Sequence, residues 1–590
     1  MITGAATDAS LRFLCRKFMI NTSNVYCRQI VELLRAHGVR TAYCSPGSRN
    51  APLLLAVDAC EEISKRVVID ERSAAFQAYG CSLIEQRPVA VICTSGTAVL
   101  DYAPAVAEAY YSGVPLIVVS ADRPKEWIDQ DDSQTIRQYG VLDNIVKGSY
   151  DVRAIPEGSL GEYTEQMQWN VNRTVNEAML KALEGKHGPV HINVQLSDPL
   201  GETQIAVPSL ERTVIHISQT EALSQETIKA LAEEMAGAKV MLVAGFSVPD
   251  HRLDKAVRTF AAYPNVTVMA ETLANLHDPQ SLSTMIDAVL CDMTEEQLER
   301  MRPDIVISMG GALVSRMLKQ YLRGYPPRYH WSLGHSNYLC DCFKTLTHRI
   351  DVSPAPFLRQ LCGAIRKSRR IIRSDYSSQW HELRKTSFSH ARTYIDHSPW
   401  TDLKAFDYIL SYGKFDNIFV SNGTAVRYSQ LIPHSCHAEY CNRGVSGIDG
   451  STSTAVGGAW AYNGKTCLLS GDISWLYDSG ASALADVPFD MRMIVLDNSG
   501  GGIFRFVKAT SVIPEETLES YFCVRHLPQA AGIAEAYGIE TMEAADMAGL
   551  KAGLKWLREE SDFPRLLVVK TPPKESAEVL KGYFDKTKTR

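Results

Sequence analysis

The sequence predicts an α/β protein built from three doubly wound parallel-sheet domains. Three observations lead to this prediction. The chain has 590 residues, too many for one hydrophobic core. Short runs rich in β-branched residues alternate with segments of helical periodicity along most of it. Each run ends in small or polar residues, as strands do at the carboxyl edge of a parallel sheet.

Four strands are expected in a first domain, residues 21–205. Each is followed at once by a polar tip. The runs and tips are Thr41–Cys44 before Ser45–Arg49, Arg66–Ile69 before Asp70–Arg72, Val89–Cys93 before Thr94–Thr97, and Pro115–Val119 before Ser120–Pro124. Because the carboxyl ends of parallel strands share one edge, we expect the tips to converge around a ligand.

Two further domains repeat the alternation. The central one, residues 215–365, has expected strands Val240–Val243, Val266–Met269 and Asp304–Ser308. Residues 366–399 are expected to be a connection, and we interpret their basic run as a solvated helix face. The last domain, residues 400–590, has expected strands Asn417–Val420, Thr466–Leu469, Met493–Leu496 and Arg565–Val569.

The charge balance argues against a nucleic-acid partner. Hydrophobic residues make up 45% of the chain, and 61 basic against 67 acidic residues leave a net charge of −6. A nucleic-acid-binding surface needs an excess of positive charge that this composition does not supply. We therefore expect small-molecule partners.

Membrane insertion, secretion and disulfide bonding are not indicated either. The longest apolar run, residues 240–246, is far shorter than the ~18 residues that a transmembrane helix needs. Residues 1–20 contain no apolar signal core, so we interpret them as a loose tail, with Met19 as a candidate start. The 14 cysteines form no Cys-x-x-Cys pair, and the 15 histidines show no metal-binding spacing. We expect a cytoplasmic protein with reduced thiols.

One β-α-β unit carries a strong chemical signal. Gly471 and Asp472 follow one expected strand, and Asn498 follows the next, 26 positions after Asp472. The two side chains then lie at neighbouring strand ends. Asp472, Asn498 and the carbonyl near Gly500 offer oxygen ligands for Mg²⁺, while amides from Gly471 to Ser474 would hold a diphosphate. Two ordinary turns are the alternative, which the spacing of both at strand ends disfavours.

This segment resembles the cofactor-binding signature of thiamine diphosphate (ThDP) enzymes. The resemblance implies that Asp472, Asn498 and the Gly500 carbonyl bind a Mg²⁺ or Mn²⁺ ion that holds the diphosphate, with Ile473 at the third signature position. Such enzymes also carry a glutamate at a strand end of another domain, which hydrogen-bonds the aminopyrimidine of the cofactor. Glu71 matches that position, so the resemblance implies that it is the catalytic residue.

Within this superfamily the chain resembles the 2-succinyl-5-enolpyruvyl-6-hydroxy-3-cyclohexene-1-carboxylate (SEPHCHC) synthases of menaquinone biosynthesis. The resemblance covers nearly the whole chain. Its motifs include the four polar tips and the segments Ser133–Gln138, Asn442–Gly450 and Asn498–Phe504. It implies that 2-oxoglutarate is decarboxylated on ThDP and that the resulting succinyl-semialdehyde carbanion adds to isochorismate.

The same resemblance assigns the remaining site residues. Ile448 matches the bulky residue that bends the cofactor, and Ile503 lies in the last cofactor-binding segment. Both substrates are dicarboxylates, which arginine binds in a bidentate manner. The substrate-binding residues that the resemblance implies are Ser48, Arg49, Arg123, Gln134, Arg316, Arg427 and Arg443. Two positions depart from the family: Gly423 stands where a serine is common, and Arg316 is the lone cation where a basic pair is usual.

Other functions remain as alternatives. One is another ThDP-dependent 2-oxo acid enzyme such as an acetohydroxyacid synthase, which the arginine set disfavours. Another is a catalytically silent relative, which the presence of Glu71, Asp472 and Asn498 disfavours. A nucleotide-binding protein is disfavoured because no Gly-x-Gly-x-x-Gly follows the first strand of any domain. The resemblance also implies a homodimer or dimer of dimers, with the active site at the subunit interface.

Overall fold

The computed structural model describes residues 20–154, 162–205, 211–217, 222–277, 285–368, 371–483, 487–507, 509–510, 512–524, 526 and 529–585. The predicted tail lies almost wholly outside these residues. The chain divides into two compact units, Met1–Ile217 and Ser218–Arg590, and each is described by itself. The second unit contains two sheets.

The first unit is built on a six-stranded parallel sheet with the order β3-β2-β4-β5-β7-β6. Its strands are β2 (Thr41–Cys44), β3 (Ser64–Val67), β4 (Val89–Cys93), β5 (Leu116–Asp122), β6 (Ser149–Val152) and β7 (Val190–Gln195). A separate antiparallel pair joins β1 (Ile20–Thr22) to β8 (Thr203–Ile205). The order changes direction at β2, as in a doubly wound sheet.

Helices cover both faces of this sheet. One face packs on α2 (Val25–Ala36), α3 (Ala51–Asp58) and α7 (Glu162–Leu183). Alternate residues of β4 and β5, such as Val91 and Val118, point to the opposite face, which lies against α4 (Glu71–Glu85). Also in this unit are α5 (Ala98–Asp101) and α6 (Ala103–Ser112).

The edge strand β3 differs from its prediction. It ends at Val67, two residues earlier than expected. The side chains of Val67 and Ile69 are both 66% exposed, so this apolar stretch does not continue into the sheet. Asp70 then caps α4 by accepting a hydrogen bond from the Ser73 amide at 3.1 Å, which fixes Glu71 as the first residue of the helix.

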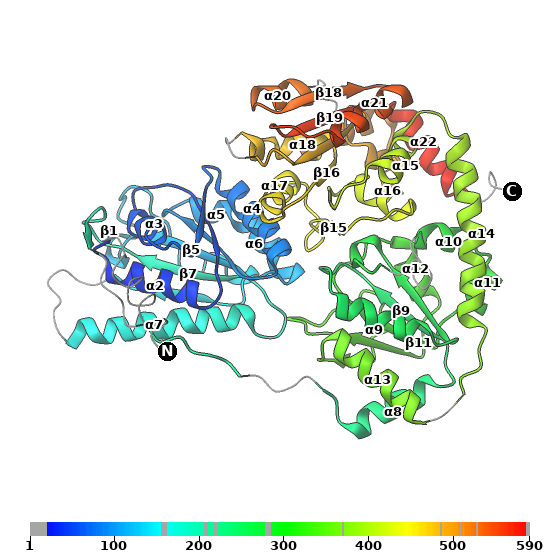
Figure 1. The fold of residues 1–590 in the computed structure, drawn as a ribbon, viewed down its shortest axis with the longest axis horizontal. Coiled ribbons are helices and arrows are strands. Elements are labelled where there is room, and N and C mark those ends of the chain that lie inside the picture. Colours follow the sequence, from blue (N-terminus) through cyan, green and yellow to red (C-terminus); the bar gives the residue numbers. More distant parts are fainter. Residues whose placement is uncertain are drawn as a thin grey trace, which may run out of the picture. The chain divides into compact units, whose positions relative to one another are not determined.

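The second unit begins with a five-stranded parallel sheet of order β10-β9-β11-β12-β13. Its strands are β9 (Val240–Ala244), β10 (Val266–Ala270), β11 (Ile305–Met309), β12 (Tyr329–Leu333) and β13 (His348–Ile350). Figure 1 shows α8 (Gln225–Met235), α9 (His251–Ala261) and α13 (Pro354–Ser368) on one side of this sheet. The opposite core includes α10 (Ile286–Asp292), α12 (Arg316–Gly324) and α14 (Tyr376–His397), with α11 (Glu295–Arg300) beside it.

A six-stranded parallel sheet of order β15-β14-β16-β17-β19-β18 completes the second unit. Its strands are β14 (Asn417–Val420), β15 (Ala438–Tyr440), β16 (Thr466–Gly471), β17 (Arg492–Asp497), β18 (Glu540–Ala544) and β19 (Arg565–Lys570). Its helices are α15 (Asp402–Tyr412), α16 (Ala425–Leu431), α17 (Ser451–Ala461), α18 (Asp472–Tyr477), α19 (Glu515–Leu518), α20 (Ala530–Ala536), α21 (Met547–Arg558) and α22 (Pro573–Tyr583). Among the described residues of both units, the short helical turns are η1 (Lys125–Trp127), η2 (Asp143–Ile145), η3 (Thr272–Ala274), η4 (Ser479–Ser482), η5 (Gly502–Arg505) and η6 (Glu519–Cys523).

The long helix α14 links the two sheets of the second unit, and Figure 1 shows it running beside both. Near its start the Tyr376 hydroxyl donates to the Met301 carbonyl at 3.1 Å. Near its end Arg392 makes a bidentate pair with Asp407 of α15, at 2.7 and 2.8 Å. The segment 366–399, expected as a connection, is therefore largely one helix.

The three sheets of six, five and six strands are parallel throughout, which confirms the predicted α/β fold class. Among the described residues, no helix is both long and apolar enough to cross a membrane.

Candidate active site

The turn after β16 holds the first predicted ligand. β16 ends at Gly471 and α18 begins at Asp472, whose residue surface is only 3% exposed. One carboxylate oxygen accepts a hydrogen bond from the Ile473 amide at 2.8 Å, and the other accepts from the Gly500 amide, also at 2.8 Å. β16 and β17 are adjacent and parallel. The loop after β17 is therefore held against the loop after β16, as the sequence predicts.

Asn498 presents an unpaired oxygen at this edge. Its amide nitrogen donates to Asp402 Oδ2 at 2.9 Å, while its Oδ1 is buried with no partner among the described residues. Asp402, the first residue of α15, is itself held by the hydroxyls of Thr571 and Ser576. Burial raises the pKa of Asp402, and the hydrogen bonds from Thr571 and Asn498 oppose that rise. An orphaned buried amide oxygen beside a carboxylate is what a hard cation such as Mg²⁺ requires.

The glycines after Asn498 permit a close approach of the backbone. Gly500 has φ +145°, and a Cβ there would lie 2.2 Å from the Cys523 carbonyl oxygen. The Gly501 amide donates to that same oxygen at 2.7 Å. Only glycine fits at position 500, so the loop is fixed with the Gly500 amide against Asp472. The Gly500 carbonyl accepts a hydrogen bond from the Gly502 amide at 2.9 Å.

Two further residues join this group, and neither was predicted. Ligand atoms of Asp472, Asp497 and His526 all lie within 4.8 Å of one another. His526 Nε2 is 3.0 Å from Asp472 Oδ2. Burial raises the pKa of Asp497, and the nearby charge of Asp472 adds to the rise. The position of Asp497 directly before Asn498 could have suggested it, whereas His526 gave no signal in the sequence.

The loop that carries Ile448 lies against the start of α18. The Ser474 hydroxyl donates to the Ile448 carbonyl at 3.4 Å. Asn422 fixes the same loop, because its amide nitrogen donates to the carbonyls of Asn442 and Gly447, both at 2.7 Å. The structure therefore brings Ile448, Ser474 and Asp472 together. Ile473 and Ile503 are half-buried near the two strand ends.

Three arginines gather in the second unit. Burial lowers the pKa of Arg427, and the positive charges of Arg443 and Arg316 lower it further. Arg443 NH1 donates to Asn422 Oδ1 at 2.8 Å. The Nε atoms of Arg427 and Arg443 are buried without a partner among the described residues. Clustered cations with unused donors form an anion-binding group.

Two buried carboxylates face this arginine group. Glu271 accepts hydrogen bonds from the amides of Val314 and Ser315, at 2.8 and 2.7 Å. Burial raises the pKa of Glu271 to about 7, and those amides and the charge of Arg443 oppose the rise. Burial also raises the pKa of Asp287, which the charge of Arg427 opposes. No sequence pattern marks either residue, because the pattern around a buried acid does not differ from that around a surface acid.

Glu71 lies in the first unit. It is half-buried at the start of α4. Burial raises its pKa, and the charges of Asp101 and Asp70 contribute a smaller rise. A glutamate with a raised pKa exchanges protons more readily near neutral pH.

The other predicted residues of this unit cluster at the carboxyl edge of its sheet. Burial lowers the pKa of Arg49, and the neighbouring charge of Arg123 lowers it further. Arg49 lies 3.6 Å from Asp198, and Arg123 pairs with Asp132 at 2.7 Å. Ser48 and Gln134 are exposed. Both arginines thus hold carboxylates that a substrate dianion could replace.

Gln138, not predicted as a site residue, supports this edge. Its side-chain amide donates to Ser120 Oγ, the Ala121 carbonyl and Asn193 Oδ1, at 3.0, 2.8 and 2.8 Å. Its carbonyl oxygen accepts from the Gly96 amide at 3.0 Å. Gln138 thereby connects the loop after β4 to the end of β5 by hydrogen bonds.

Three loops of the predicted motifs share an unusual backbone geometry. Gln134, Ser446 and Ser499 have φ values of 52°, 64° and 60°. Non-glycine residues rarely adopt this region, and active-site loops are one place where they do.

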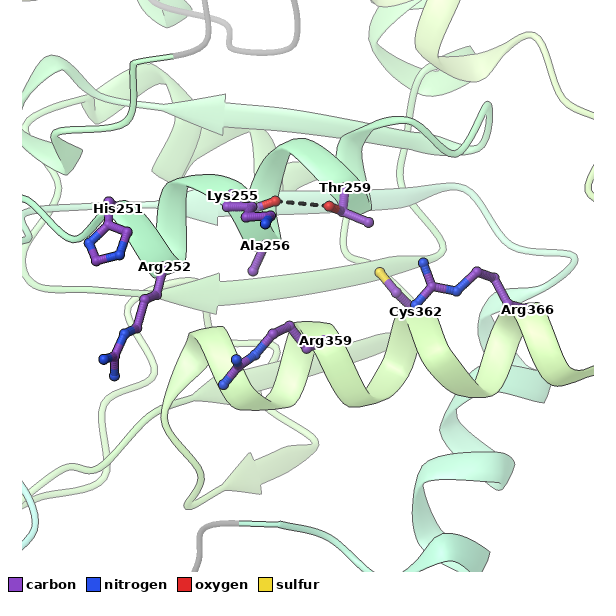
Figure 2. Close-up of a pocket in the computed structure, with 8 residues that line it drawn as sticks. All are labelled: His251, Arg252, Lys255, Ala256, Thr259, Arg359, Cys362 and Arg366. Carbon is purple, nitrogen blue, oxygen red and sulfur yellow. Dashed lines mark hydrogen bonds between the residues drawn. The ribbon is translucent and has the colours of Figure 1, made fainter.

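A separate cavity of about 450 Å³ lies between α9 and α13. Figure 2 shows four cationic side chains among the residues around it, and no predicted site residue lines it. The lining residues are His251, Arg252, Lys255, Ala256, Thr259, Arg359, Cys362 and Arg366.

The N-terminal unit matches a known family of cofactor-binding domains. Residues 26–141 match the family model described as the thiamine pyrophosphate enzyme, N-terminal TPP binding domain. Together with the Asp472–Asn498 edge, this match defines the class: the protein is a thiamine diphosphate enzyme.

Relatives of nearly the same length place the chain in one family of this class. The chain is 38% identical to 2-succinyl-5-enolpyruvyl-6-hydroxy-3-cyclohexene-1-carboxylate synthase of Porphyromonas gingivalis, over 94% of this chain and 96% of that protein. It is 33% identical to the synthase of that name from Flavobacterium johnsoniae, over 96% and 99%. It is 36% identical to the one from Desulfotalea psychrophila, over 85% and 90%. The chain belongs to the SEPHCHC synthase family, which confirms the resemblance seen in the sequence.

Proposed function

We propose that the protein decarboxylates 2-oxoglutarate and joins the remaining four-carbon unit to isochorismate, yielding SEPHCHC and carbon dioxide in menaquinone biosynthesis. The observation that carries this proposal is the arginine group of Arg316, Arg427 and Arg443, with its unused buried donors. Two dicarboxylate substrates need such fixed cations, whereas a monocarboxylate 2-oxo acid leaves most of them unpaired.

The residues of the second unit fit ThDP and a divalent metal. Asp472, Asn498 and the Gly500 carbonyl would hold Mg²⁺ or Mn²⁺, and the amides from Gly471 to Ser474 would face the diphosphate. When bound, ThDP supplies the electron sink for decarboxylation. Ile448, held beside α18 through Ser474, would press on the cofactor from one side.

The chain's own residues supply proton transfer and substrate orientation. Glu71 would hydrogen-bond the aminopyrimidine and exchange a proton with it, and its raised pKa supports that role. Arg49, Arg123 and the exposed Ser48 and Gln134 would orient the carboxylates of isochorismate or 2-oxoglutarate. Thr424, beside Gly423, is the hydroxyl nearest in sequence to the family's missing serine.

A homodimer, or a dimer of dimers, with the active site at the subunit interface is part of the proposal. The exposed side chains of Val67 and Ile69, just before Glu71, support it, because apolar residues beside a catalytic group are typical of an interface. A cytoplasmic location is also proposed, and it is supported by the free thiol state of all 13 described cysteines.

The test is a turnover assay that omits one component at a time. The complete mixture contains ThDP, Mg²⁺, 2-oxoglutarate and isochorismate, and the product is identified by mass. We expect isochorismate loss only with all four, and a product mass of isochorismate plus the 2-oxoglutarate mass less carbon dioxide. Carbon dioxide release without isochorismate loss would refute the acceptor, and turnover of pyruvate instead would favour an acetohydroxyacid synthase.

A matched pair of variants tests the arginine group. Arg443→Lys keeps the charge but loses the bidentate geometry, so the KM for 2-oxoglutarate or isochorismate should rise at least about tenfold. Arg252→Lys, in the separate cavity of Figure 2, is the control and should leave both KM values unchanged. Equal changes in KM for the two variants would show that Arg443 does not bind the substrates.

A further inference from the structure

A second group of metal-ligating side chains lies apart from Asp472. His434, Cys436 and Glu439 each offer a ligand atom, and these atoms lie within 4.8 Å of one another. The side chains of His434 and Glu439 are 2% and 1% exposed. The segment leads from α16 into β15, and its spacing matches none of the common metal motifs. The sequence pattern therefore does not indicate a metal site here.

The hydrogen bonds of His434 show that a cation belongs at this point. Its Nδ1 lies 2.8 Å from the Ile432 carbonyl, which can only accept, so Nδ1 carries a proton. In the neutral ring, Nε2 then has only a lone pair. Yet Nε2 faces the Glu439 Oε2 at 2.9 Å, and a carboxylate oxygen also only accepts. Either a second proton or a metal ion must lie between them.

A proton satisfies only part of the group. It serves the His434–Glu439 pair and leaves Glu439 Oε1 buried without a partner among the described residues. A divalent ion would displace the proton at His434 Nε2 and the thiol proton of Cys436, and both protons would pass to solvent. Glutamate, thiolate and a +2 ion sum to zero charge, which a buried site tolerates.

The side chain of Asn275 holds the backbone of Glu439 in place. The Asn275 side chain accepts from the Glu439 amide at 2.8 Å and donates to the Glu439 carbonyl at 3.0 Å. A histidine whose other ring nitrogen donates to a carbonyl is the usual arrangement of a metal-ligating imidazole. Two ligands of one tetrahedral zinc are about 3.3 Å apart. The His434–Glu439 distance would therefore need to widen by only a few tenths of an ångström.

We propose that His434, Cys436 and Glu439 bind one structural zinc ion per chain. Nitrogen, sulfur and oxygen ligands together favour Zn²⁺ over Mg²⁺ or Mn²⁺. The ion would hold the turn between α16 and β15 in one conformation. Arg427 lies in α16, and Arg443 follows β15. The site is independent of the proposed function.

The test measures metal in the full-length protein purified without chelators. We expect about one zinc per chain by elemental analysis. Replacement with Co²⁺ should give a thiolate-to-cobalt charge-transfer band in the near ultraviolet, which the Asp472 site cannot give because it contains no thiol. Cys436→Ser should lose the zinc and the band. Cys342→Ser, which changes another part-exposed thiol, should keep both.

Three results would overturn the proposal. One is wild-type protein that holds no zinc and gives no charge-transfer band when titrated with Co²⁺. Another is a band that disappears in Cys342→Ser and survives in Cys436→Ser. The third is zinc retained in full by both Cys436→Ser and His434→Asn. The wild-type measurement decides the matter even if a variant fails to fold.

Discussion

If Asn498 binds the metal as proposed, Asp402→Asn should weaken metal-dependent cofactor binding without changing a proposed metal ligand. The wild-type carboxylate accepts hydrogen bonds at both oxygens, from Asn498 on one side and from Thr571 and Ser576 on the other. An asparagine that keeps the two hydroxyl partners turns its own NH₂ toward the Asn498 NH₂. Asn498 then rotates its amide, so that a nitrogen donor replaces the oxygen that is proposed to bind the metal.

The size of the effect follows from the bond that is lost. A hydrogen bond to a charged group contributes about 1.5–3 kcal/mol. At about 1.4 kcal/mol for each factor of ten, this corresponds to roughly 10- to 100-fold weaker binding. Changes in residues that orient metal ligands commonly have effects of about this size.

The assay titrates Mg²⁺ at saturating ThDP and follows tryptophan fluorescence, since the buried Trp475 lies in α18 close to Asp472. The half-saturating Mg²⁺ concentration should rise about 10- to 100-fold. Asp407→Asn is the matched control, because Asp407 lies on the same helix but pairs with Arg392. An unchanged Mg²⁺ requirement in a folded Asp402→Asn protein would refute the reasoning.

Three other predictions concern single residues. Glu71→Gln should keep the fold and bind ThDP but lose at least about 100-fold in turnover, and near-normal turnover would exclude its acid–base role. Gly500→Ala should strain the loop by about 1–3 kcal/mol and weaken ThDP binding measured by calorimetry, whereas equal affinity would show that the loop can move away from Cys523. Burial lowers the pKa of His191 from 6.5 to about 4. Between these two pH values the unfolded chain binds a proton that the folded protein does not bind. The free energy of unfolding should therefore fall as the pH drops from 6.5 to about 4. His191→Gln should reduce the difference between the unfolding temperatures at pH 6.5 and pH 5, and an unchanged difference would contradict this assignment.

The sequence predicted strands best where apolar residues run without interruption. β14 has the predicted bounds, and β9 and β16 begin where expected. β7 was missed because its His191 and Asn193 look like surface residues. Both are fully buried, and Asn193 hydrogen-bonds Asp122 and Asp151 inside the sheet edge. Polar networks of this kind depend on tertiary partners that no local pattern shows.

Some residues of the candidate site could likewise be predicted from the sequence, and others could not. Asp472 and Asn498 were predictable because strand ends and glycine turns mark them in the sequence. Asp402 and His526 were not, because their roles depend on contacts with residues 96 and 54 positions away. His434 and Glu439 show how a buried pair can stay hidden when its spacing matches no known motif.

The α14 helix has a consequence for the arginine group of Arg316, Arg427 and Arg443. It anchors the central sheet through Tyr376 and the last sheet through Arg392, and Asn275 adds a direct bond between the two. Arg316 belongs to the first of these parts, and Arg427 and Arg443 to the second. The fold therefore keeps the three guanidinium groups close together, despite their mutual repulsion, before any ligand binds. If this group binds the substrates as proposed, a dicarboxylate that enters would relieve this repulsion and would spend little binding energy on bringing the cations together.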